Sequence, residues 1–151
     1  MSDPCSTANV VIFIHEHLAD ATTLGAQIQV PSSSILGLSG WETTWGNNRF
    51  AREGNNYFSL HGTRTAPYAN GSMQAAGARV SLSTFPSYLA SGQSFIAQYG
   101  QFLRGAKTPE AFSQGLIRSH FNSGSAKTGG NDNFVSNTVT AIAMVEKRKA
   151  C

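Results

Sequence analysis

The chain has 151 residues, which fits one compact domain over residues 1–151 and leaves no room for a second. Charged residues make up only 13% of it, about half the usual share. The polar surface must therefore come mainly from Ser, Thr, Asn, Gln and Gly, which suits a neutral polymer such as a glycan and does not suit a phosphate backbone. The net charge of +3 is scattered except for the run 147–149, so no nucleic-acid partner is expected.

The first half of the chain begins with two predicted helices. Apolar residues recur at helical spacing over residues 7–24, and Gly25 ends the pattern. The run 31–34, Pro-Ser-Ser-Ser, supplies cap hydroxyls for a second helix, which carries Glu42 and stops near residues 46–48.

The middle of the chain differs in character. Residues 47–83 are rich in Gly, Asn, Ser and Thr, with apolar residues spaced as in short strands, and this predicts a small β-containing lobe. Helical periodicity returns over 91–103, Thr108 caps the next helix, and the last helix spans 134–149. The fold class expected is therefore α+β and mainly α.

The two cysteines stand near opposite ends of the sequence, at Cys5 and Cys151. Chain ends often lie close together at a protein surface, so the pair is either two unrelated thiols or a disulfide formed in an oxidising compartment. The four histidines show no metal-ligand spacing, and neither a metal nor a cofactor is expected.

Export signals are also missing from the sequence. No segment approaches the roughly 20 apolar residues of a membrane span. The apolar stretch 10–14 follows no basic region and is interrupted at once by His15, Glu16 and His17, so no secretory signal is predicted. A substrate outside the cytoplasm would require another export route, or a signal removed before this sequence begins.

Eight carboxylates are available for chemistry, and most have an ordinary explanation. Six lie on an expected free chain end, helix faces, helix ends or loops: Asp3, Glu16, Asp20, Glu110, Asp132 and Glu146. Glu42 and Glu53 remain. Glu42 stands between Trp41 and Trp45, and burial among indoles should raise its pKa by desolvation. A protonated carboxyl is what glycosidic cleavage needs, although a buried structural Glu would fit the local sequence equally well.

A resemblance to a known family adds to this reading. The segments Val30–Leu36, Glu42-Thr43-Thr44-Trp45-Gly46 and Asn55–Gly62 are similar to the endo-β-N-acetylglucosaminidase family of peptidoglycan hydrolases, which includes flagellar muramidases and autolysins. The family pattern is a Glu, two small residues and Trp-Gly, followed by Asn-Asn, an aromatic or aliphatic residue, and then Phe-Gly-aliphatic-Lys-Gly. The resemblance is concentrated between residues 30 and 62 and extends more weakly into the last helix.

The resemblance implies a lysozyme-like fold, in which a helical lobe and a small β or loop lobe flank a cleft. It places Glu42 as the catalytic acid. The substrate-binding candidates, from the motif and from the loop after it, are Trp45, Asn55, Asn56, Tyr57, Phe58 and Tyr68. For several of these a structural role competes: Asn55 and Asn56 would also satisfy backbone groups at a turn, and Trp45 and Phe58 would also serve as core residues.

Two departures from the family pattern bear on the mechanism. Family members place a second carboxylate in the β lobe, whereas residues 54–109 contain no Asp or Glu. Glu53 is then the nearest second acid, and a substrate-assisted route that uses the sugar's own acetamido group is favoured slightly over it. Phe121 stands where the family has a Tyr, so Tyr57 or Tyr68 is expected to supply a hydroxyl instead.

The activity expected is hydrolysis of a β-1,4 bond in peptidoglycan, on the N-acetylglucosamine side. The alternatives are a muramidase, a lytic transglycosylase or a non-catalytic glycan-binding module. A bare catalytic domain without a signal resembles an antibacterial toxin delivered by a type VI secretion machine, or a phage lysin, acting in the periplasm or outside the cell. A toxin would imply a cognate immunity protein that occludes the cleft.

Overall fold

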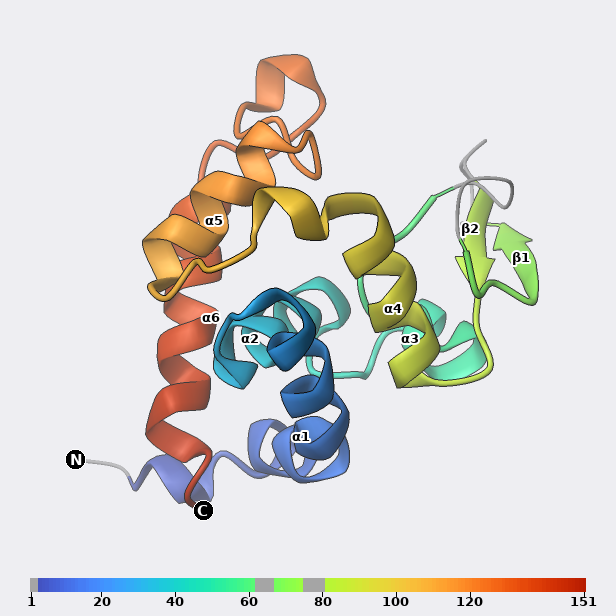
Figure 1. The fold of residues 1–151 in the computed structure, drawn as a ribbon. Helices are drawn as coiled ribbons and strands as arrows, with labels where there is room; N and C mark the ends of the chain where they lie inside the picture. Colours follow the sequence, from blue (N-terminus) through green and yellow to red (C-terminus); the bar gives the residue numbers. More distant parts are fainter. Residues whose placement is uncertain (1–2, 62–66, 75–80) are drawn as a thin grey trace.

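Helix α2 (Ser32–Thr43) lies at the centre of the fold and packs against α1 (Ala8–Ile28) and α6 (Phe134–Arg148) (Figure 1). Residues 33–40 of α2 are all buried, including three serines and two glycines. A helix buried on all sides shows no amphipathic stripe, so α2 depends on its neighbours for its stability. At Gly37 an added Cβ would lie 2.7 Å from the Cα of Ile142, so the close approach of α2 to α6 requires glycine.

The computed structural model describes residues 3–61, 67–74 and 81–151. Gly62, the last residue of the family motif, lies outside these ranges, as do other parts of the predicted β lobe. The remaining elements, in chain order, are η1 (Pro4–Ser6), α3 (Arg49–Gly54), β1 (Gly71–Gln74), β2 (Ser81–Thr84), α4 (Tyr88–Tyr99), η2 (Gly100–Phe102), α5 (Pro109–Arg118) and η3 (Ala126–Thr128).

The β lobe is an antiparallel hairpin. Strand β1 pairs with β2 from Gly71 opposite Thr84 to Gln74 opposite Ser81, and His61 forms an isolated bridge with Leu82. Helix α3 lies beside the hairpin (Figure 1). The mainly helical fold with a small β lobe is thus confirmed, and within residues 67–74 and 81–84 the sheet has two strands.

Several predicted boundaries were correct. Thr108 caps α5 by accepting a hydrogen bond from the N–H of Ala111 at 3.1 Å, and α6 begins at Phe134 as predicted. Other boundaries were wrong. Helix α3 was not predicted, because its six residues are too few to show a periodicity, and α2 ends at Thr43, before the predicted stop.

The prediction that Gly25 ends the first helix was also wrong. Helix α1 continues to Ile28 and ends at Gln29, which has left-handed backbone angles. The carbonyl of Gly25 accepts the N–H of Val30 at 2.9 Å, and a Cβ at Gly25 would lie 2.5 Å from the carbonyl oxygen of Val30. The glycine therefore permits close approach of the returning chain and does not interrupt the helix. None of the helices in the described ranges is long and apolar enough to cross a membrane.

The two ends of the described chain are joined. Cys5 and Cys151 form a disulfide with their Cα atoms 5.6 Å apart, and Figure 1 shows the termini at the same corner. Close by, Arg148 Nη2 donates to Thr7 Oγ1 at 3.3 Å, so α6 is tied to the start of α1 by a second contact.

We expect the Cys5→Ser substitution to lower the free energy of unfolding by about 1–4 kcal/mol, because the bond closes a loop of 146 residues and restricts the unfolded chain. Urea unfolding with and without a reductant measures this. The reductant should destabilise the oxidised wild type and leave Cys5→Ser unchanged. Equal sensitivity of the two proteins to the reductant would contradict the prediction.

Candidate active site

The carboxyl of Glu42 lies at the end of the buried helix α2. The helix is followed by three residues with left-handed backbone angles: Thr44 (φ 51°), Trp45 (φ 56°) and Gly46 (φ 81°). Such angles are rare for a β-branched residue like Thr44. They are held by hydrogen bonds, since Trp45 N–H donates to the Gly40 carbonyl at 2.7 Å and Gly46 N–H donates to Thr43 Oγ1 at 3.0 Å.

Opposite Glu42 runs the segment 56–60, which Asn56 holds in place. Asn56 has no exposed surface, and its Nδ2 donates to the carbonyls of Leu60 and Ser83, both at 2.9 Å. Its Oδ1 accepts from the N–H groups of Phe58 at 3.4 Å and Leu60 at 3.0 Å. The segment is thereby fixed against β2, and Ser59, which has φ 53°, is directed to the end of α2.

Ser59 and Glu42 form the central contact of the site. Ser59 Oγ donates to Glu42 Oε2 at 2.9 Å. Burial raises the pKa of Glu42 above its ordinary value by desolvation, and the Ser59 hydrogen bond offsets part of that rise. The negative end of the α2 macrodipole also disfavours the carboxylate. Glu42 is therefore placed to keep its proton at a higher pH than an ordinary Glu.

The carboxyl of Glu42 lines a cavity of about 190 Å³. The other lining residues come from three separate segments: Ser59, His61, Tyr99, Phe121, Asn122 and Gly129. A second hollow, of about 340 Å³, shares three of these residues and continues along the loop between α5 and α6. Its lining adds hydroxyls, backbone amides and His120 but no Asp, Glu, Lys or Arg. The combined depression is polar and nearly free of charged side chains, which suits a neutral polymer.

The structure does not bring Glu53 to this cavity. Glu53 is exposed on α3 and forms an ion pair with Arg49 four residues earlier, its Oε2 3.1 Å from Arg49 Nε. The prediction of Glu53 as a second catalytic acid is therefore not supported by its position, and Glu42 is the one carboxylate among the described residues that line the cavity.

Several predicted substrate-binding residues have structural roles instead. Asn56 and Phe58 have no exposed surface, and Phe58 stacks on Phe95 with ring centroids 4.7 Å apart. Asn55 ends α3 with left-handed backbone angles, and its Nδ2 donates to the Phe85 carbonyl at 3.0 Å. For these three residues the competing structural interpretation is the one that fits.

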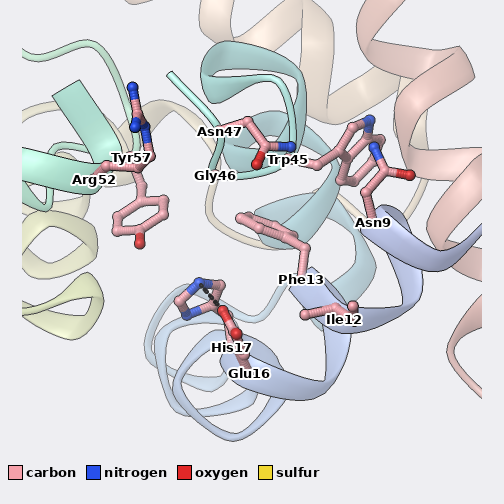
Figure 2. A pocket seen from close by; sticks show the side chains of 10 residues that line it. All are labelled: Asn9, Ile12, Phe13, Glu16, His17, Trp45, Gly46, Asn47, Arg52 and Tyr57. Carbon is pink, nitrogen blue, oxygen red and sulfur yellow. Dashed lines mark ion pairs between the residues drawn. The ribbon is translucent and has the colours of Figure 1, made fainter. Parts of the chain in front are cut away.

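The remaining candidates lie elsewhere. Trp45 and Tyr57 line a different cavity, on the side of α1 (Figure 2). Tyr68 is 58% exposed and lines neither the Glu42 cavity nor its continuation. In the described part of the chain none of these three side chains lines the Glu42 cavity, so their role in substrate binding stays a prediction.

Sequence reasoning missed Tyr99. This half-buried residue at the end of α4 lines the Glu42 cavity and packs edge-on against Phe121, with ring centroids 5.2 Å apart. It supplies the phenol expected from Tyr57 or Tyr68. The sequence carries no signal for this position, because Tyr99 reaches the cavity through the packing of α4, on which Phe95, four residues earlier, stacks on Phe58.

Comparisons with known proteins show which proteins this chain resembles. No protein-family model and no curated protein matches the chain. A chain of a type VI secretion system effector–immunity complex from Pseudomonas protegens is 33% identical, with a TM-score of 0.88 over 99% of this chain and 100% of that one. The chain belongs to the same family as this matched chain of the type VI secretion complex.

Two further solved structures show the fold. A peptidoglycan hydrolase from Sphingomonas sp. A1 is 15% identical, with a TM-score of 0.73 over 93% of this chain and 94% of that one. The glycoside hydrolase domain of FlgJ from Salmonella typhimurium is 18% identical, with a TM-score of 0.65 over 91% and 97%. The fold is therefore the lysozyme-like fold of peptidoglycan hydrolases, as predicted.

We expect Glu42→Gln to stabilise the protein at pH 7. A carboxyl whose pKa is raised on folding costs stability as the pH rises from its unfolded pKa to its folded one, and the neutral amide avoids that cost. The gain in melting temperature should shrink as the pH falls to about 3, where Glu42 is protonated in both states. Glu53→Gln is the control and should give no gain. A Glu42→Gln protein less stable than wild type at pH 7 would contradict the raised pKa.

Proposed function

We propose that the chain is a peptidoglycan hydrolase that cleaves β-1,4 bonds of the glycan, with Glu42 as the general acid. The observation that carries the proposal is a carboxyl with a raised pKa, placed at a cavity whose other lining groups are polar or aromatic and carry no second carboxylate. Glycosidic cleavage requires a proton for the leaving oxygen, and Glu42 is the group in this cavity that holds one to a higher pH than an ordinary Glu.

The missing second carboxylate favours a substrate-assisted route. In that route the acetamido oxygen of N-acetylglucosamine attacks the anomeric carbon while Glu42 gives its proton to the leaving oxygen. The same Glu42 then takes a proton from the water that opens the resulting ring. N-acetylmuramic acid carries the same acetamido group, so this route is open at either sugar, and cleavage on the N-acetylglucosamine side is proposed from the sequence resemblance alone. A muramidase or a lytic transglycosylase would also rely on one acid, and mass spectrometry of the released ends separates the three products.

The proposed setting is antibacterial. The relative at 33% identity was solved within an effector–immunity complex, which supports a role for this chain as a toxin of type VI secretion acting on the cell wall of another bacterium. A cognate immunity protein would then protect the producing cell by occluding the Glu42 cavity. A phage lysin would share the fold and the acid but would need no such partner.

We expect Glu42→Gln to lower the rate of peptidoglycan cleavage by about 10²–10⁴-fold, the usual contribution of a general acid, because the amide has no acidic proton to donate. Zymography and the release of reducing ends measure this. Wild-type activity should fall as the pH rises through the raised pKa of Glu42, since only the protonated carboxyl is active. Activity of Glu42→Gln within a few-fold of wild type would reject the proposal, and a glycan-binding module would then be the alternative.

The Glu53→Gln variant is the matched carboxylate control and tests the substrate-assisted route. Because Glu53 is exposed and paired with Arg49, we expect its loss to change the cleavage rate by less than about threefold. A loss as severe as that of Glu42→Gln, at an unchanged melting temperature, would instead make Glu53 the second catalytic carboxylate.

A further inference from the structure

A cavity of about 340 Å³ lies between α1 and the turn that follows α2 (Figure 2). It is called the second cavity below and is distinct from the hollow of similar size along the loop between α5 and α6. None of its lining residues belongs to the Glu42 cavity or to the hollow that continues it. The same two segments nevertheless build both sites. Trp45 follows Glu42 by three residues, and Tyr57 precedes Ser59 by two. The two cavities therefore share their supporting backbone.

The base of the second cavity holds a polar atom without a partner. His17 is only 9% exposed, and its ring stacks on Tyr88 with centroids 4.1 Å apart and touches Phe13 and Tyr57 edge-on. Among the described residues its Nε2 has no hydrogen-bond partner, and Glu16 Oε2 lies 3.8 Å away, beyond hydrogen-bond range. A buried polar atom normally finds a partner, so this one suits a ligand group.

Opposite charges stand on different sides of the opening. Figure 2 shows Glu16 and His17 on α1, with Arg52 and Tyr57 across the cavity from them. Arg52 is exposed on the last turn of α3 and is not part of any ion pair of the described residues, while the side chain of Glu16 is 62% exposed. Phe13, Trp45 and Tyr57 supply apolar surface between the charges.

We propose that this cavity binds the zwitterionic end of a peptidoglycan stem peptide, a proposal that rests on the function proposed above. The ammonium group would bind the Glu16 carboxylate and donate to His17 Nε2, and the carboxylate would bind the Arg52 guanidinium. The aliphatic part would pack on Tyr57 and Trp45. A diamino acid whose second amino acid centre is free presents this arrangement of one positive charge, one negative charge and a short apolar chain.

A binding measurement tests the cavity without relying on catalysis. The Glu42→Gln protein is titrated with a disaccharide tripeptide that ends in meso-diaminopimelate, and with the same disaccharide lacking the peptide, while the His17 ring signals are followed by NMR. We expect the tripeptide to shift these signals and to bind at least tenfold more tightly than the bare disaccharide. Additional Glu16→Gln or Arg52→Gln substitution should remove most of that advantage, whereas Glu110→Gln and Arg118→Gln, both outside the cavity, should keep it.

A kinetic comparison separates this proposal from the function it rests on. Wild type should cleave peptide-bearing glycan several-fold faster than glycan stripped of its peptides, and Glu16→Gln should lose that preference while keeping the rate on stripped glycan. If wild type cleaves neither substrate, the hydrolase proposal fails, yet tripeptide binding at His17 would still support the cavity. Equal affinity for the two probes, or an advantage that survives both substitutions, would overturn the proposal.

Discussion

The geometry of both cavities depends on one buried amide. The four hydrogen bonds of Asn56 fix the segment 56–60 against β2. Three consecutive side chains of this segment then lie in three different parts of the molecule. Tyr57 lines the cavity beside α1, Phe58 enters the core, and Ser59 meets Glu42. A buried polar network is costly unless every member is satisfied, and here each amide atom has a partner. Asn56, the second Asn of the Asn-Asn pair, thus positions the chain and is buried out of reach of a sugar.

The second constraint is the position of Glu42 at the end of a helix with almost no exposed face. A carboxyl there loses hydration and meets the negative end of the helix macrodipole, so the same features that suit it for proton donation make it costly to the fold at neutral pH. The Ser59 hydrogen bond stabilises the ionised carboxylate and so offsets part of that cost. The left-handed turn after α2 belongs to the same arrangement, since it ends the helix immediately after the acid and directs Trp45 to the other cavity.

Much of this was predictable from the sequence, and the limits have physical causes. Long amphipathic helices such as α6 and the cap at Thr108 were found because local patterns determine them. The isolation of Glu42 among apolar neighbours also appears in the sequence. The grouping of side chains into cavities does not, because it depends on backbone angles at Thr44, Trp45 and Ser59 that these residue types rarely adopt. Tyr99 was missed since it joins the site only through the packing of α4 on Phe58.

The bond between Cys5 and Cys151 has a consequence for how the molecule tolerates damage. It encloses nearly the whole described chain in one covalent ring, so a single proteolytic cut in an exposed loop, such as the one between α5 and α6, opens the ring without releasing a fragment. The two pieces remain one molecule of nearly unchanged mass and are held at high effective concentration for reassociation. In surroundings rich in proteases and lacking reductants, the first cut would therefore leave the protein in one piece, and only a second cut would remove a segment.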